Sequence, residues 1–223
     1  MRLRLVAPIL VLLAGQLVAQ SVQDRLAGRI PSGAVPAVDS LVQVARQETL
    51  PTEPLVQKAL EGGAKQVPAP RIVAAVQASL GQLRDARDLL VHAGDQPPPQ
   101  PAEVTTVAWA LRRRLPAPVV ERVVAALPQP PRAAALHAVA DLVAHRFDAD
   151  SATDLIIDAI HQGVKGERLL DVSTAAVHEL QRGRTRGEAI GIVQRQLPNV
   201  PAAPKPARGT VVRARRPGAP VSP

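Results

Sequence analysis

The chain has 223 residues, a formal net charge of +8 and no cysteine. The lack of cysteine excludes disulfide bonds, lipid attachment through a cysteine thiol and a cysteine nucleophile. Tyrosine is also absent, and one tryptophan and one phenylalanine are the only aromatic residues. The core of any folded part must therefore consist mainly of aliphatic side chains.

Residues 1–19 have the organisation of a secretory signal peptide. Two arginines form a short basic start, residues 5–13 form an apolar run, and small residues follow up to Ala19. The run is too short for a membrane span, which needs about 20 apolar residues. We expect cleavage after Ala19, export to the periplasm or the medium, and no transmembrane span in the mature chain. An uncleaved amphipathic anchor is the alternative.

Residues 20–197 show a helical period of apolar side chains and no strand alternation, which predicts an all-α domain built as an irregular array of helical hairpins. Thr185 with Glu188 has the form of a capping box, and Ser151 with Asp154 predicts a second one. The predicted helices cover about residues 22 to 29, 36 to 48, 52 to 64, 69 to 92, 102 to 114, 117 to 127, 131 to 146, 151 to 164, 167 to 182 and 186 to 196.

Parts of this domain resemble one another. Residues 54–65 align with residues 154–165, and the Val-Pro-Ala-Pro turn at 67–70 recurs as Leu-Pro-Ala-Pro at 115–118. We interpret this as three degenerate repeats of about 50 residues, in which each hairpin buries its apolar face on its neighbours. The alternative is that helices rich in alanine, leucine and proline look alike by composition. The repeat predicts matching buried positions at Leu60, Leu111 and Ile160.

Residues 198–223 differ in character from the rest of the chain. They contain seven prolines, no acidic residue and almost nothing to bury, which predicts a disordered tail. We expect this tail to give weak electrostatic tethering to anionic components of the cell envelope. The alternative is a merely solubilising terminus. Its expected contacts are the five cations Lys205, Arg208, Arg213, Arg215 and Arg216.

Most of the net charge lies outside the predicted domain. Without the two arginines of the signal peptide and the five cations of the tail, residues 20–197 carry a net charge of +1. The basic composition is therefore no sign of a nucleic-acid-binding face, and we expect no nucleic acid partner. One basic cluster remains, and it falls at a predicted helix C-terminus, where cations interact favourably with the helix dipole. It consists of Arg112, Arg113 and Arg114.

The sequence contains no phosphate-binding loop, nucleophile elbow, dinucleotide fingerprint or zinc-protease motif. One polar constellation stands out, because Asp154, Asp158, His161 and Lys165 share one face of a predicted helix. Such a face suits a divalent metal ion or an acid and base pair, but the same spacing is typical of a solvated helix face. We expect no catalytic residue and no cofactor, and a metal site only if Asp154, Asp158 and His161 form one.

These observations predict an exported, non-enzymatic helical protein that serves as an interaction or scaffold module of the cell envelope. Its partner would be an unidentified protein or an anionic envelope component. Two alternatives remain open at this point. One is a small enzyme or metal-binding protein centred on Asp154, Asp158 and His161, and the other is a periplasmic chaperone or adaptor with an exposed apolar groove.

The signal peptide generates a direct prediction about the mature chain. Protein recovered from the periplasm or the medium should have an intact mass that corresponds to a chain starting at Gln20 or Ser21. Mass spectrometry of the secreted fraction measures this. Recovery of only the full-length chain, in the membrane pellet, would contradict the prediction and support an anchor.

Overall fold

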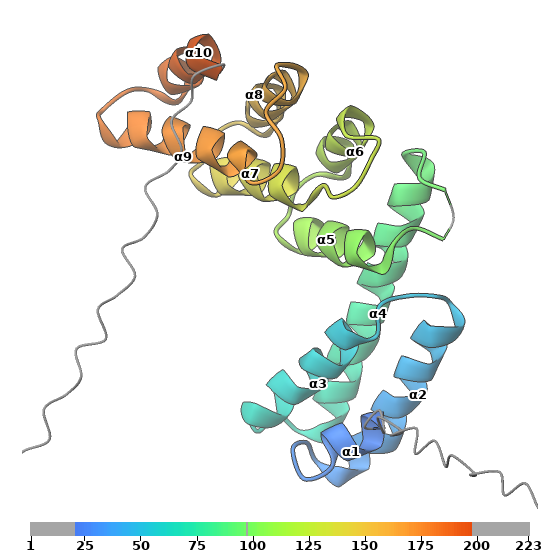
Figure 1. Ribbon diagram of the computed structural model, residues 1–223. Helices are drawn as coiled ribbons and strands as arrows, with labels where there is room; N and C mark the ends of the chain where they lie inside the picture. Colours follow the sequence, from blue (N-terminus) through green and yellow to red (C-terminus); the bar gives the residue numbers. More distant parts are fainter. Residues whose placement is uncertain (1–20, 97, 198–223) are drawn as a thin grey trace, which may run out of the picture. The chain divides into compact units, whose positions relative to one another are not determined.

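The structure is a computed structural model that describes residues 21–96 and 98–197. Within these residues the regular secondary structure is entirely helical, which confirms the predicted all-α class (Figure 1). The predicted signal peptide and tail lie outside the described residues. The elements are α1 (Val22–Leu26), the 3-10 helix η1 (Ser32–Ala34), α2 (Val35–Gln47), α3 (Glu53–Ala64), α4 (Ala69–His92), α5 (Pro101–Arg112), α6 (Ala117–Ala126), α7 (Ala133–Ala144), α8 (Ala149–His161), α9 (Arg168–Gln181) and α10 (Arg186–Gln196).

The ten α-helices of the described residues match the ten predicted ranges, with differences of a few residues at their ends. Helix α10 begins with the predicted capping box, in which the Glu188 N–H donates to the Thr185 hydroxyl and the Thr185 N–H donates to the Glu188 carboxylate. The second predicted capping box, at Ser151, is wrong. Helix α8 starts earlier because Asp148 caps it, accepting the Ser151 N–H at 2.9 Å. None of the helices in the described ranges combines the length and the apolar character that crossing a membrane requires.

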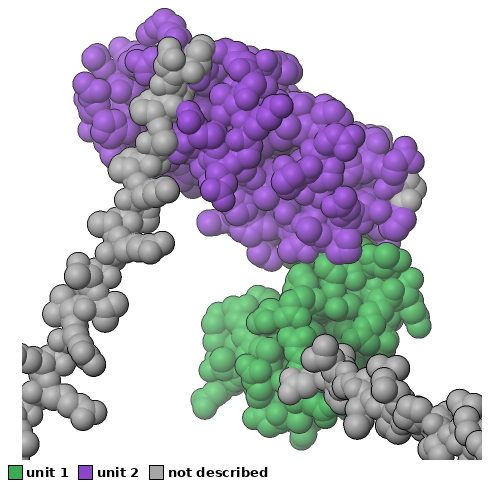
Figure 2. Space-filling view, viewed as in Figure 1, with its two compact units in different colours: residues 1–84 green, residues 85–223 purple. Residues whose placement is uncertain are grey.

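The chain divides into two compact units, residues 1–84 and residues 85–223 (Figure 2). Unit 1 contains α1, α2, α3 and the larger part of α4. Unit 2 contains the end of α4 and all of α5 to α10. The candidate site described below lies entirely in unit 2.

One backbone turn recurs within unit 2. After the end of α5, α7 and α9, a residue with positive φ is followed by a residue whose N–H donates to the carbonyl five residues earlier. The positive-φ residues are Arg114, Arg146 and Gly183. The side chain after the turn is buried in the first two cases, as Leu115 and Phe147. Across these turns α5 with α6, α7 with α8, and α9 with α10 form three helical hairpins. The same turn also follows α8, at Gly163, where it joins two hairpins.

These three hairpins stack in two layers. The first-helix layer consists of α5, α7 and α9, because α7 contacts both α5 and α9 (Figure 1). In the second layer α8 contacts both α6 and α10. Fully buried alanines such as Ala110, Ala138 and Ala159 let neighbouring helices approach closely. Each hairpin therefore buries its apolar face on the next one, as in helical arrays generally.

The predicted repeat of about 50 residues is not confirmed. The recurring hairpin turns at Arg114, Arg146 and Gly183 follow one another at a shorter interval. The aligned segments also differ in their place, because α5 is the first helix of a hairpin and α8 is the second. The predicted full burial of Leu60, Leu111 and Ile160 is wrong, because all three are half-buried. The fully buried residue is in each case the alanine directly before, namely Ala59, Ala110 and Ala159.

A buried cation joins several segments of unit 2. Arg132 precedes α7 and has a side chain that is only 1% exposed. Removing a charge from water costs several kcal/mol unless its hydrogen bonds are made inside the protein. Here the guanidinium donates to Asp95 at 2.7 and 3.0 Å, to Glu103 at 3.4 Å, and to the carbonyls of Leu127 and Pro128 at 2.7 and 3.2 Å. The chain before α5, the first turn of α5 and the α6–α7 connection are thereby held together.

This network predicts a large stability loss on removal of the cation. Arg132→Met should lower the free energy of unfolding by about 3 to 5 kcal/mol, because the buried Glu103 carboxylate loses its partner. Urea denaturation of the purified chain measures the change. The exposed Arg112→Met is the matched control and should cost less than about 0.5 kcal/mol. Adding Glu103→Gln to Arg132→Met should restore part of the lost unfolding free energy, because no unpaired carboxylate then remains at position 103. Equal losses for Arg132→Met and Arg112→Met would contradict the role of the network.

In unit 1 an ion pair connects α1 to α3. Arg25 donates two hydrogen bonds of 2.8 Å to the two carboxylate oxygens of Glu53. These bonds, with one from Gln57, lower the pKa of Glu53 from 4.5 to about 2. The Glu53 side chain is 56% exposed, so solvent screens the pair and its contribution to stability stays below about 1 kcal/mol.

The lowered pKa of Glu53 gives a pH dependence with a defined sign. The stabilisation is fully present above pH 4.5 and is lost as the pH falls through about 2, because the unfolded chain then binds the proton more readily. Glu53→Gln should therefore cost up to about 1 kcal/mol at neutral pH, with a difference from the wild type that shrinks on acidification. Unfolding measured across this pH range, with Glu121→Gln as a control variant, tests this. A difference that does not change with pH would contradict it.

Candidate functional site

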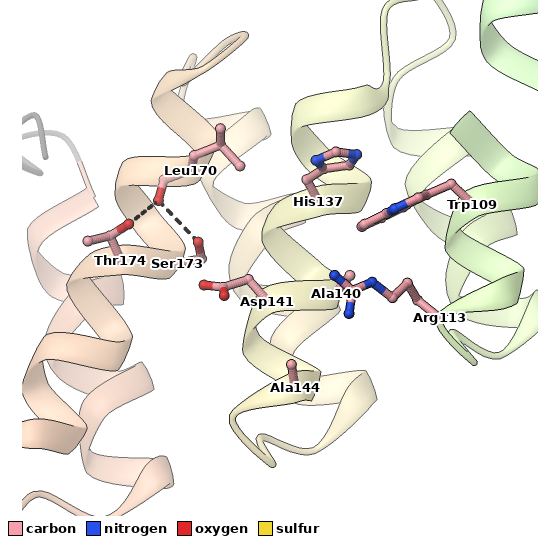
Figure 3. Close-up of a pocket in the computed structure, with 9 residues that line it drawn as sticks. All are labelled: Trp109, Arg113, His137, Ala140, Asp141, Ala144, Leu170, Ser173 and Thr174. Carbon is pink, nitrogen blue, oxygen red and sulfur yellow. Dashed lines mark hydrogen bonds between the residues drawn. The ribbon is translucent and has the colours of Figure 1, made fainter. Parts of the chain in front are cut away.

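A hollow of about 380 Å³ opens on the first-helix layer of unit 2 (Figure 3). Each of the three hairpins contributes side chains from its first helix. Residues that are three or four apart on a helix share one face, which is why each helix supplies a short strip. The strips are Trp109 and Arg113 from α5, His137, Ala140, Asp141 and Ala144 from α7, and Leu170, Ser173 and Thr174 from α9.

Trp109 is the only tryptophan of the chain, and it is half-buried at one end of the hollow. The His137 ring stacks on the indole, with 4.0 Å between the ring centroids and 26° between the planes. The guanidinium carbon of Arg113 lies 5.4 Å from the indole centroid, a cation–π distance. These two neighbours hold the indole in one orientation, and His137 covers one of its faces. The result is a fixed aromatic surface beside a recess.

The opposite wall of the hollow presents hydrogen-bond acceptors. In Figure 3 the Asp141 carboxylate is directed from α7 toward α9. The hydroxyls of Ser173 and Thr174 both donate to the Leu170 carbonyl, at 3.1 and 2.8 Å, so their protons are used within α9. The oxygen of the exposed Thr174 can still accept a hydrogen bond, whereas Ser173 is buried at 2% exposure. The hollow thus has donors on the Arg113 side and acceptors on the Asp141 side.

The two hydroxyls of the hollow have the Leu170 carbonyl, and not a histidine, as their hydrogen-bond partner within the described residues. A nucleophilic hydroxyl needs a base within hydrogen-bond reach. In the part of the chain that the structure describes, no hydrogen bond joins His137 to Ser173 or Thr174, and the His137 ring is stacked on Trp109. The lining supplies a recess, an aromatic ring, hydrogen-bond donors and hydrogen-bond acceptors.

The predicted site residues on α8 do not line this hollow. Asp154 forms an ion pair with Arg122 of α6, and Asp158 accepts a hydrogen bond of 3.0 Å from Gln194 of α10. These two carboxylates therefore connect α8 to both of its neighbours in the second layer. His161 is exposed at the end of α8. Within residues 21–96 and 98–197 no group of three or more histidines, aspartates and glutamates is placed to hold a metal ion.

The predicted tail contacts lie outside the described residues. They are Lys205, Arg208, Arg213, Arg215 and Arg216.

Sequence reasoning missed the hollow. The available signal was the chain's only tryptophan with an arginine four residues later, a spacing that places both on one helix face. That spacing does not say what faces them. His137 and Leu170 reach Trp109 and Arg113 only through the stacking of three hairpins, which is not visible in a local pattern.

We compared the chain with models of protein families, with curated proteins and with solved structures, and none of these comparisons found a match. The function is therefore inferred from the chain's own residues and geometry.

Proposed function

We propose that this chain is an exported, non-enzymatic interaction module that binds a partner protein of the cell envelope at the hollow beside Trp109. The observation that supports it most is the half-exposed tryptophan, held between Arg113 and His137 at the rim of a recess. Tryptophan and arginine are the residues most enriched at the energetic centres of protein interfaces. A recess next to such an anchor can accept a side chain of the partner.

The size and polarity of the hollow favour a polypeptide segment as its occupant. A volume of about 380 Å³ is at the small end of ligand pockets and suits one or two side chains. A peptide carries both donors and acceptors along its backbone, which matches the Arg113 side and the Asp141 side. The hollow crosses α5, α7 and α9, and helical arrays commonly bind extended segments along such a layer.

Export and tethering belong to the same proposal. Residues 1–19 would direct the chain out of the cytoplasm. The five cations of residues 198–223 would hold it near anionic surfaces, with at most about 1 kcal/mol from each. Such weak, reversible contact would bring the helical domain to its partner without fixing its orientation.

Site-specific photo-crosslinking in the producing cells tests this function. A photoreactive amino acid at Thr174, in the hollow, should give a discrete adduct with a partner protein. The same group at His161, exposed on α8, is the matched control and should give none. Adducts from His161 and not from Thr174 would overturn the proposal and favour a site on α8.

A substitution at the anchor completes the test. Trp109→Leu keeps an apolar side chain but removes the indole, and it should reduce the Thr174 adduct at least about tenfold if the tryptophan is an interface hot spot. Circular dichroism of the variant shows whether the helices are retained. Undiminished crosslinking by a folded Trp109→Leu variant would show that Trp109 does not contribute to partner binding.

A further inference from the structure

A row of arginines follows the hairpin turns of unit 2. Three of them end α5, one follows α7, and two lie where α9 leads into α10. All are exposed. We call this row the basic edge, and it consists of Arg112, Arg113, Arg114, Arg146, Arg184 and Arg186.

The turns that carry these arginines are neighbours in the stack. The Arg186 Nε donates to the carbonyl of His145 at 3.2 Å, which joins the last turn to the middle one. Arg113 and Ala144, the last residue of α7, line the same hollow, which joins the middle turn to the first. The three turns that carry the basic edge therefore lie at the same end of the stacked hairpins.

The helix dipole explains only part of this edge. Cations are favoured at the C-terminus of a helix, which accounts for Arg112 and Arg113. Arg186, however, is the first residue of α10, where the dipole disfavours a cation. Internal pairing also explains only part of the edge, since Arg184 interacts electrostatically with Glu188 and Arg186 donates to the His145 carbonyl. In the described residues Arg122 and Arg182 form ion pairs with carboxylates, whereas no such pair within 4.0 Å is found for the arginines of the basic edge.

We propose that the basic edge binds acidic side chains of the partner polypeptide whose neighbouring segment occupies the hollow. This inference deepens the proposed function and rests on it, since it names the chemistry of the same partner. Arg113 connects the two surfaces, because it belongs to the basic edge and also lines the hollow. Guanidinium groups suit this role, since their planar array of donors matches both oxygens of a carboxylate.

The charge pattern favours a polypeptide over a phosphate polymer. Asp148 caps α8 and Glu188 belongs to the capping box of α10, so carboxylates interrupt the basic edge beside the second and third turns. A duplex nucleic acid carries a charge about every 1.7 Å and would meet these carboxylates. An extended polypeptide advances about 3.3 Å per residue and can place a neutral residue opposite each of them.

The aromatic residues also disfavour single-stranded nucleic acid, which binds by stacking its bases on exposed rings. Phe147 is 3% exposed, and His137 covers one face of Trp109. Residues 20–197 carry a net charge of only +1, so an acidic ligand would be bound by the local cluster of arginines and not by a general excess of positive charge.

The sole tryptophan provides a local readout for the test. An unlabelled oligoglutamate peptide is titrated into the mature chain at low salt while the Trp109 emission is followed. Binding at Arg113 should alter this emission, because its guanidinium carbon lies 5.4 Å from the indole centroid. We expect a saturable change that weakens as the ionic strength rises, because salt screens the charges.

The decisive variant carries one substitution in each turn: Arg114→Gln, Arg146→Gln and Arg184→Gln. Gln66 already adopts positive φ after α3, so glutamine is compatible with the backbone at 114 and 146. This variant should bind oligoglutamate at least about tenfold more weakly than the wild type, since close charge pairs across an interface carry coupling energies above about 1.4 kcal/mol. The matched control removes the same charge from exposed arginines of unit 1, with Arg29→Gln, Arg46→Gln and Arg71→Gln, and should bind like the wild type.

Three results would overturn the inference: no emission change in the wild type, equal loss in both triple variants, or tighter binding of inorganic polyphosphate than of oligoglutamate. The crosslinking experiment distinguishes this inference from the proposed function. A Thr174 adduct without oligoglutamate binding would contradict only the role of the basic edge. Oligoglutamate binding without a Thr174 adduct would contradict the role of the hollow as the docking site.

Discussion

The array of unit 2 depends on the backbone turn that stops α5, α7 and α9. A single residue with positive φ, at Arg114, Arg146 or Gly183, ends the helix and sends the chain straight into the next one. The three first helices pack in one layer, because α7 contacts both α5 and α9. The stacking of Trp109 on His137 is one contact within this layer.

The positions of the helices could be predicted because each is encoded locally. Apolar residues at three-and-four spacing, prolines at helix starts and the Thr185 capping box need no knowledge of distant parts of the chain. The repeat could not be predicted in this way, since similar helix faces made the first helix α5 look equivalent to the second helix α8. The face of Asp154 was visible in the sequence, but its partner Arg122 lies on another helix. Side chains that meet only through stacking, such as those of the hollow, leave no local pattern.

Arg132 has a different role from the arginines of the basic edge. It is buried in a core of aliphatic side chains, where its five donors find carboxylates and carbonyls from separate segments. Apolar side chains pack in many alternative ways, whereas this set of hydrogen bonds can be satisfied in one arrangement. The guanidinium thus selects how the chain before α5 and the α6–α7 connection meet.

The last hairpin closes the hollow and, within the described residues, packs on the hairpin before it. Helix α9 contacts α7 and α8 of the preceding hairpin, and α10 contacts α8 and α9. In a stack of this kind the end unit can open while the rest stays folded. Opening would remove the wall formed by Leu170, Ser173 and Thr174, and would leave the stacked Trp109 and His137 in place. A partner that binds only the closed hollow therefore stabilises the docked state of α9. Amide hydrogen exchange in α9 should then slow as the fraction of bound protein rises.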